Sequence, residues 1–406
     1  MKIIFISGLY TSQLETFLLK ISTSYIQNAP NVFQWAVVDG LDSNKVDFEV
    51  LSYPFLPCFP TNKFIKSPKE DIMYNGKHIG KVMEYCTIPL IKQLMISSSI
   101  KNELIKILNR NRNEEIVVLT YTPLSYFVKP VIELKKKYNN LSLVSIITDL
   151  IDDLLYFKDN SSFLKRIQNK LEYESVKKAY AGIDQFILLT EQMVEKISEA
   201  DNKYIVVEGI APFNKISDFY KEKKDEGVRS IFYAGTLQEF SGIRELLSAF
   251  GKIKNKNYRL VICGEGVLTP EIKNAALLDN RIIYKGMQPR EEVLKLQKEA
   301  TLLINPRRPD KSITRFSFPS KTMEYLVSGT PMIGYKLEGI PEEYYGYFYT
   351  VDGLDEESLI DVIQKTLSLP QEILNEKARK AYNFVIQNKT AKMQVKRIID
   401  FISKDN

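Results

Sequence analysis

The stretch RFSFPSKTMEYLVSGTP, residues 315–331, predicts a short loop, a proline and then a helix. Pro319 suits the first helical turn, because its ring presets φ and its missing N–H would have no helical partner. Ser320 and Lys321 then lie where free backbone N–H groups and the positive end of the helix dipole attract an anion. Glu324 follows one turn later. A cationic helix start with one carboxylate nearby favours a phosphate ester that also carries hydroxyls, such as a nucleotide or a sugar nucleotide.

The same helix belongs to an alternation of strands and helices that fills the second half of the chain. Gly329 ends the helix, and a new extended run opens at Thr330. Apolar runs predict strands at 230–234, 259–263, 281–284, 301–305, 332–335 and 348–351, and helical spacing covers 243–253, the residues leading up to 278, 290–298 and 356–367. Strands that alternate with helices through short links predict a parallel, doubly wound sheet.

The first half shows the same alternation with one long interruption. Strands are predicted at 2–7, 33–38, 48–52, 116–120, 143–148, 185–189 and 204–207, and helices at 89–108, 124–137, 163–179 and 192–199. Residues 54–81 have no clear periodicity, and a plain surface excursion explains them somewhat better than an acceptor-side loop does. Helical segments at 372–386 and 390–402 close the chain, and the second carries an apolar stripe.

A chain of 406 residues is too long for one ordinary core, so we expect two domains. Residues 211–228 contain Pro, Asn and a charge run, and we place the linker there. The predicted domains are 1–210 and 229–385, each a Rossmann-like α/β unit, followed by a C-terminal helix at 386–406. Two such domains facing each other form an interdomain cleft, a common location for small-molecule sites.

The composition, with 44% apolar and 26% charged residues, is that of a soluble globular protein. The net charge of +6 is spread over many segments, which fits an acidic membrane face or an anionic substrate better than dedicated nucleic-acid binding. Three widely separated cysteines indicate neither a disulfide framework nor a zinc site and predict a reducing cytosol. The first apolar run is too short for a signal peptide, and no segment reaches transmembrane length. The single histidine, His78, excludes a multi-histidine metal site.

Several catalytic motifs are excluded. Gly264 and Gly266 follow a strand as in a dinucleotide fingerprint, but Thr269 occupies the third glycine position, which argues against a nicotinamide dehydrogenase. The two glycines still permit a close approach of the backbone to a ligand. The chain has no P-loop, no G-x-S-x-G elbow and no histidine for a triad, which argues against kinase-type NTPases and esterases. No D-x-D motif occurs, so we expect no metal–diphosphate site and no cofactor.

Gly8 and Asp149 are candidates in the first half, because each follows a predicted strand at the end where open α/β sheets place their sites. Gly8 lets a ligand approach the backbone, although a simple tight turn explains it equally well. Asp149 is placed either to orient a sugar hydroxyl or to cap the following segment. Asp152 and Asp153 form an acidic cluster with it.

Four cations gather in the second half, with Arg307 and Arg308 in one loop and Arg315 and Lys321 around the helix start. Any single one of them is more often a solvated surface charge. Four of them within one loop and one helix start favour an anion site.

These motifs resemble the nucleotide-sugar-binding domain of retaining GT-B glycosyltransferases of the family 4 (group 1) type. The likeness covers roughly residues 230–345 and is carried by FYAGTL, the glycine before IRELLSAF, RLVICGEG, IIYKG, LLINP and SFPSKTMEYLVSGTPMI. It is strongest with the branch from capsule, lipopolysaccharide and exopolysaccharide assembly, whose members read FPSK-x-x-EY and then small-Gly-x-Pro. The first half is similar in architecture and in an Asp-Leu after a strand. The resemblance implies a GT-B fold whose final helix crosses back to the N-terminal domain.

The resemblance also implies roles for individual residues. It places ribose hydroxyls on Glu324, the diphosphate at the helix start and the base near residues 284–286, with the acceptor around Gly8 and Asp149. The catalytic residues it implies are Lys321, Arg315 and Asp149. The donor-binding residues it implies are Gly8, Gly235, Thr236, Gly264, Gly266, Tyr284, Gly286, Arg307, Ser317, Pro319, Ser320 and Glu324.

Two positions depart from the family pattern. Phe316 stands where many relatives have a glutamate, eight positions before the second one, and Ser241 stands where many have a basic residue. Neutralisation of the diphosphate then falls to Arg315, Lys321 and Arg307.

We therefore expect a cytoplasmic, retaining, metal-independent glycosyltransferase, placed at the inner face of the cell membrane if its acceptor is lipid-linked. It would move a sugar from a nucleotide diphosphate sugar to a glycan or polyprenyl-linked acceptor in bacterial surface polysaccharide biosynthesis. Fixed cations would stabilise the negative charge that develops on the departing diphosphate. The two departures leave open a non-catalytic, sugar-nucleotide-binding partner of another transferase. A GT-B sugar-nucleotide epimerase fits the motifs less well.

Overall fold

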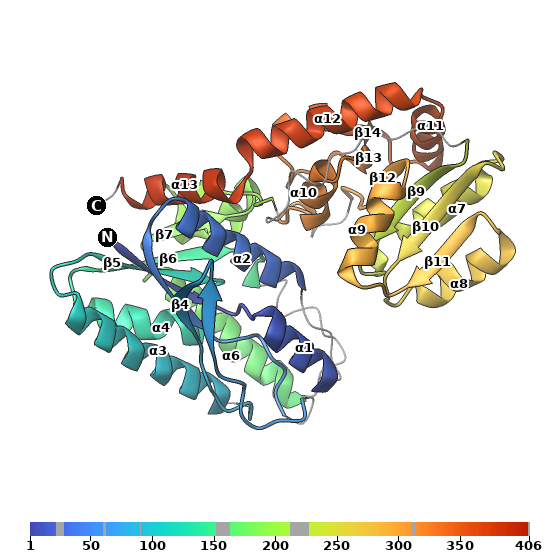
Figure 1. Ribbon diagram of the computed structural model, residues 1–406. Coiled ribbons are helices and arrows are strands. Elements are labelled where there is room, and N and C mark those ends of the chain that lie inside the picture. Colours follow the sequence, from blue (N-terminus) through green and yellow to red (C-terminus); the bar gives the residue numbers. More distant parts are fainter. Residues whose placement is uncertain are drawn as a thin grey trace. The chain divides into compact units, whose positions relative to one another are not determined.

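The computed structural model describes residues 1–21, 28–59, 62–89, 91–151, 163–211, 227–310 and 314–404. Within these ranges the chain forms two compact units (Figure 1). Unit 1 comprises Met1–Ile210 together with Ala391–Asn406, and unit 2 comprises Ala211–Thr390. Most of the expected linker, residues 212–226, lies outside the described residues, as do Asp152 and Asp153.

Unit 1 is built on an eight-stranded sheet with the order β3-β4-β2-β1-β5-β6-β7-β8. Its strands are β1 (Lys2–Ser7), β2 (Asp47–Ser52), β3 (Glu70–Tyr74), β4 (Lys77–Val82), β5 (Ile116–Tyr121), β6 (Leu141–Ile147), β7 (Gln185–Leu188) and β8 (Tyr204–Val206). All neighbouring strands run parallel except β3 and β4, which pair antiparallel. β5 is buried along its whole length, as expected for a parallel strand covered on both faces.

Helices pack on both faces of the unit 1 sheet. They are α1 (Ser12–Ile21), α2 (Asn28–Ser43), α3 (Ile91–Arg110), α4 (Ser125–Lys135), α6 (Phe163–Tyr180) and α13 (Ala391–Ile402). α13 lies along α2, as Figure 1 shows, so the last described helix belongs to the first unit. No helix in the described part of the chain combines the length and the apolar character needed to cross a bilayer.

Three expectations for unit 1 are wrong. Residues 33–38 are not a strand but the middle of α2, where Val37 and Val38 are fully buried. The middle of α2 is mostly apolar because the helix packs against both the sheet and α13, and a short apolar run fits a strand or a buried helix equally well. Residues 54–81 contain β3 and nearly all of β4, whose many charged residues give no sign of a sheet although Ile72 and Ile79 are buried. Residues 192–199 form two 3₁₀ turns, η1 (Glu191–Lys196) and η2 (Ser198–Ala200), instead of an α-helix.

Unit 2 is built on a six-stranded parallel sheet with the order β11-β10-β9-β12-β13-β14. Its strands are β9 (Arg229–Ala234), β10 (Tyr258–Cys263), β11 (Ile282–Gly286), β12 (Leu302–Asn305), β13 (Met332–Tyr335) and β14 (Tyr349–Val351). The chain adds β10 and β11 on one side of β9 and then continues with β12 on its other side. The crevice at the carboxyl ends of β9 and β12 is therefore a topological switch point, where open α/β sheets bind ligands.

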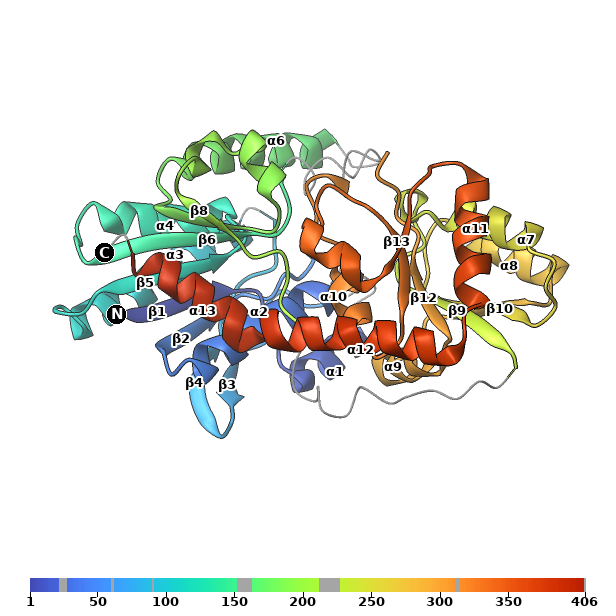
Figure 2. The ribbon, with the colours of Figure 1, turned by 90° about the horizontal axis from the view of Figure 1, so that it is seen from above.

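The unit 2 helices are α7 (Ile243–Lys252), α8 (Thr269–Leu278), α9 (Arg290–Glu299), α10 (Ser320–Val327), α11 (Glu356–Leu367) and α12 (Gln371–Asn388). The described part of unit 2 also contains the short 3₁₀ segments η4 (Glu239–Ser241) and η6 (Glu342–Tyr347). α11 packs on α7, and α12 packs on α10 (Figure 2). α12 also contacts η6. The strand and helix positions expected for this half of the sequence are confirmed to within a few residues.

Candidate active site

The loop after β9 and the start of α10 bring Gly235 and Lys321 into contact. A Cβ built on Gly235 would overlap both Cε and Nζ of Lys321, so the lysine side chain lies directly against the glycine. The same Nζ lies 5.3 Å from the centre of the Tyr233 ring on β9. The glycine therefore makes room for an ammonium group at the carboxyl end of β9.

Lys321 is largely buried, and the described residues form no hydrogen bond or ion pair with its ammonium group. Burial, together with the positive charge of Arg307, lowers the pKa of Lys321 to about 8, and the negative charge of Glu324 opposes that shift. A buried cation beside a second cation is unfavourable unless an anion joins it. Binding of a negatively charged ligand would therefore relieve the unfavourable electrostatics of Lys321 and Arg307.

Arg307 supplies the second cation, from the loop that follows β12. Its Nη1 donates to Oγ of Ser317 at 3.4 Å, and its guanidinium carbon lies 5.4 Å from the centre of the Phe240 ring. The structure therefore brings Gly235, Arg307 and Lys321 together, as the sequence predicts.

The start of α10 offers backbone donors to the same region. Pro319 is expected in the first helical turn, but it is the N-cap residue, with φ −67° and ψ 115°, and the helix begins at Ser320. No side chain of the described residues caps the helix, and the first amide bonded within the helix is that of Thr322, which donates to the carbonyl of Pro319 at 2.8 Å. The N–H groups of Ser320 and Lys321 therefore remain available to an anion.

The carboxylate of Glu324 is held by side chains of α9. Nε2 of Gln297 donates to it at 2.5 Å, and Nη1 of Arg290 lies 3.6 Å from its other oxygen. Gln297 is 1% exposed, and its own Oε1 has no hydrogen-bond partner within the described ranges. Sequence reasoning missed both α9 residues, although a glutamine on the inner face of an amphipathic helix is a signal that a buried polar partner exists.

The glycines after β10 serve contacts between loops. Gly264 has φ +127°, and a Cβ there would overlap the carbonyl oxygen of Gly235. A Cβ on Gly266 would likewise overlap the carbonyl oxygen of Leu237. These two glycines let the loops after β9 and β10 pack backbone against backbone.

Tyr284 and Gly286 tie β11 to the same loops. The hydroxyl of Tyr284 donates to the carbonyl of Gly264 at 2.9 Å, and the amide of Gly264 donates to the carbonyl of Gly286 at 2.9 Å. Thr236 is exposed, and its carbonyl accepts from the hydroxyl of Tyr233 at 3.0 Å. The expected donor residues at the ends of β9, β10 and β11 thus form one connected rim at the carboxyl edge of the sheet.

Arg308 and Arg315 are directed to other partners. Nε of Arg315 donates to Glu338 at 2.8 Å, and its guanidinium carbon lies 5.5 Å from the centre of the Phe316 ring. Nε of Arg308 lies 3.3 Å from Asp310. The expected cluster of four cations is therefore reduced to Lys321 and the arginine beside it.

Ser241, which stands where many relatives have a basic residue, cannot supply the positive charge of that residue. It is 5% exposed, and its hydroxyl donates to the carbonyl of Gln238 at 2.5 Å.

Among the described residues, no three His, Cys, Asp or Glu side chains lie close enough together to hold a metal ion.

The two candidates in unit 1 follow different strands. Gly8 follows β1, its amide donates to Oε1 of Gln34 at 2.6 Å, and a Cβ there would overlap the ring of Phe55. Asp149 follows β6 and is exposed. Burial raises the pKa of Tyr121 above its ordinary value, and the negative charge of Asp149 raises it further. Since β5 lies between β1 and β6, these residues do not come from neighbouring strands.

Comparisons with known proteins agree with this architecture. The family described as glycosyl transferases group 1 matches residues 228–368. The apo form of the lipopolysaccharide outer core galactosyltransferase WaaB is 12% identical, with a TM-score of 0.62 over 100% of both chains. HepE from Anabaena in complex with UDP and glucose is 12% identical, with a TM-score of 0.59 over 99% of both chains. The catalytic domain of starch synthase IV from Arabidopsis thaliana, bound to ADP and acarbose, is 9% identical, with a TM-score of 0.63 over 100% of this chain and 99% of that one.

A search of the curated proteins finds no match to the sequence. The structural likenesses nevertheless extend over the whole chain, and the family match covers most of the unit 2 sheet together with Lys321 and Glu324. The chain therefore has the GT-B fold, and its residues 228–368 match the family of group 1 glycosyl transferases.

Proposed function

We propose that the chain is a retaining, metal-independent glycosyltransferase that moves a sugar from a nucleotide diphosphate sugar to a glycan acceptor in surface polysaccharide biosynthesis. The observation that carries the proposal is the ammonium of Lys321, which is largely buried beside Arg307 and has no partner in the described part of the chain. The uncapped start of α10 adds backbone donors to these two cations. The diphosphate of a donor is the anion that fits this arrangement.

Cleavage of the glycosyl–diphosphate bond leaves negative charge on the diphosphate and oxocarbenium character on the sugar. Lys321, Arg307 and the first N–H groups of α10 are fixed before the reaction, so they stabilise the leaving group without reorganising. Removal of one such group costs about 3 kcal/mol of barrier. In this proposal the protein cations take the part that a metal ion plays elsewhere.

Glu324 is the proposed reader of the donor ribose. Its side chain is 26% exposed, Gln297 donates one hydrogen bond to one oxygen, and Arg290 lies 3.6 Å from the other oxygen. A carboxylate in this state accepts from the two hydroxyls of a ribose. The nearby rim formed by β11, with Tyr284 and Gly286, is the proposed base-binding side.

The acceptor is proposed to bind unit 1 near Gly8 and Asp149. A lipid-linked acceptor at a cytoplasmic membrane face is consistent with the start of α3, where Ile91, Leu94 and Met95 are 45%, 72% and 44% exposed. Exposed apolar side chains on the first turns of one helix favour contact with a lipid surface.

Lys321→Ala tests the proposal, with Lys336→Ala as a matched control. Lys336 is an exposed lysine of the same unit that pairs with Asp352 at 3.1 Å. We expect Lys321→Ala to abolish the thermal stabilisation by UDP or ADP and to reduce donor hydrolysis about 100-fold, while Lys336→Ala changes neither. Near-normal activity of Lys321→Ala with an intact fold would contradict the diphosphate assignment.

A non-catalytic sugar-nucleotide-binding partner is the second candidate. The ion pair of Arg315 with Glu338 favours it, because a cation expected to replace the missing family residues is directed to a protein carboxylate instead. Binding of UDP-sugars without any hydrolysis or transfer over a panel of glycan acceptors would support this candidate against the enzyme.

A further inference from the structure

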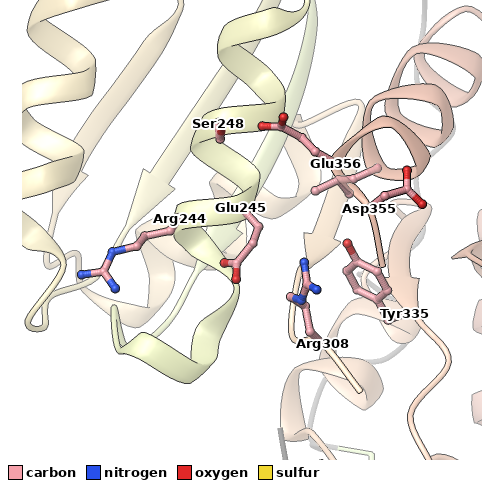
Figure 3. Close-up of a pocket in the computed structure, with 8 residues that line it drawn as sticks. Arg244, Glu245, Ser248, Arg308, Tyr335, Asp355 and Glu356 are labelled. Atoms are coloured by element: carbon pink, nitrogen blue, oxygen red, sulfur yellow. The ribbon is translucent and has the colours of Figure 1, made fainter. Parts of the chain in front are cut away.

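A cavity of about 300 Å³ lies in unit 2 between α7 and α11, beside the ends of β12 and β13 (Figure 3). It is lined by Arg244, Glu245, Ser248, Arg308, Tyr335, Asp355, Glu356 and Leu359. None of these residues belongs to the proposed donor site, whose side chains come from α9, α10 and the loop residue Arg307. A volume of this size accommodates a ligand of one or two sugar rings.

Three of the charged residues around the cavity are already satisfied by the protein. Arg244 pairs with Glu239 and Glu271, and Figure 3 shows its guanidinium pointing away from the cavity. The carboxylate of Glu356 pairs with Lys252, and that of Asp355 caps α11 by accepting from the amide of Ser358 at 2.8 Å.

Three other groups point into the cavity without a complete set of partners. Tyr335 is 3% exposed, and its hydroxyl forms no hydrogen bond with the described residues. The carboxylate of Glu245 has no ion pair or hydrogen bond in the described ranges, and the terminal nitrogens of Arg308 have none either. Figure 3 shows the guanidinium of Arg308 between Glu245 and Tyr335, with no ion pair to that glutamate. A carboxylate, a guanidinium and a hydroxyl therefore lie around one small cavity, and a bound ligand could supply the hydrogen-bond partners that the described residues do not.

The charges around the cavity indicate which ligand that is. An anion would face Glu245 as well as the carboxylates of Asp355 and Glu356, and a cation would face Arg308. A neutral polyhydroxylated ring avoids both conflicts, because each of its hydroxyls both donates and accepts. Neighbouring hydroxyls would donate to Glu245 and accept from Arg308 and Tyr335, while Leu359 offers an apolar surface to the C–H groups of the ring.

We propose that the cavity between α7 and α11 is a binding site for a neutral sugar residue of a glycan, separate from the donor site. Its existence does not depend on the proposed diphosphate site, because the two share no residue. A glycan chain anchored here would be held on unit 2 by a contact that neither Lys321 nor Glu324 makes.

Saturation-transfer NMR with the methyl glycosides of glucose, galactose and N-acetylglucosamine, each at tens of millimolar, tests this proposal on the full-length protein. We expect at least one glycoside to bind, and Glu245→Gln and Tyr335→Phe each to weaken it about tenfold. Arg244→Gln is the matched control, since it alters a lining residue whose charge points away, and it should leave the affinity unchanged. If the proposed donor site is correct, UDP should stabilise all three variants as much as the wild type, whatever the result with the sugars.

Two outcomes would overturn the proposal. One is that no glycoside receives saturation, or that a bound glycoside is indifferent to both Glu245→Gln and Tyr335→Phe. The other is that glycine or alanine binds and displaces the glycoside, which would assign the cavity to an amino acid with its carboxylate on Arg308. A loss of UDP binding in Lys321→Ala alone would concern the donor site and leave this test intact.

Discussion

The ammonium of Lys321 occupies the space that a side chain at Gly235 would need. The loop after β9 and the first turn of α10 are therefore adjusted to each other around one cation, which the described residues leave without an ion pair.

Gly235→Ala should displace the lysine tail and weaken the binding of nucleoside diphosphates more than it lowers stability. The clashing atoms belong to the end of a flexible side chain, which can move away, but the ammonium then leaves the diphosphate position. Titration with UDP and ADP should show a loss of about tenfold or more. Gly251→Ala on α7 is the control, because nothing lies within 4 Å of its added Cβ; equal losses in both variants would contradict the argument.

The affinity for nucleoside diphosphates should fall as the pH rises past about 8. The pKa of Lys321 is lowered from 10.5 to about 8, so the free protein loses the ammonium charge above that value. The free energy of unfolding should change in the opposite direction to the affinity. Between about pH 8 and pH 10.5 the unfolded chain binds more protons than the folded chain, so the stability rises with pH. Urea unfolding and UDP titration at pH 7 and pH 9 measure both effects.

Lys321→Met separates this lysine from other groups that titrate in the same range. The variant should bind UDP weakly at both pH values, and its stability should lack the rise that the wild type shows. A wild-type pH profile that persists in Lys321→Met would show that another group is responsible.

Glu324→Gln should reduce the preference for UDP over 2′-deoxy-UDP. A ribose hydroxyl that donates to a carboxylate contributes roughly 1.5–3 kcal/mol, and the neutral amide retains only part of it. Gln297→Met should act in the same direction, because it removes the donor at 2.5 Å that orients the carboxylate while keeping the buried volume. If the double variant loses as much as the sum of the two single losses, Gln297 does not act through Glu324.

Gly40→Ala should destabilise unit 1 by about 2 kcal/mol. A Cβ at this position on α2 would overlap Val395 and would lie 2.5 Å from the carbonyl oxygen of Ala391, so α13 has to move. Val395→Ala relieves only the side-chain part of the clash and should restore a fraction of the stability. Chemical denaturation of the single and double variants provides the measurement.

The sequence predicts the unit 2 fold well because each of its strands is a short apolar run followed by a glycine or a polar loop. The same reasoning fails at residues 33–38, where burial of α2 on both sides removes the periodicity that distinguishes a helix. It also cannot find the hydrogen bond between Gln297 and Glu324 or the ion pair between Arg315 and Glu338, because contacts across 27 and 23 residues depend on how α9 and the loops pack.

Part of the candidate site could likewise be predicted from the sequence, and part could not. The glycines and cations after the strands could be predicted, since parallel strands gather their carboxyl ends at one edge. Which arginine turns toward Lys321 and which toward Glu338 or Asp310 depends on side-chain directions that follow only from the packed structure.

Unit 1 is assembled from two separate pieces of chain, since α13 follows all of unit 2 in the sequence but packs on α2. During synthesis, the surface of α2 around Gly40 therefore stays uncovered until every strand of unit 2 has been made. Unit 2 is therefore synthesised in full before α13, which packs on a helix about 350 residues earlier in the chain. Chaperones acting on the nascent protein would thus meet an incomplete first half next to a completed second one.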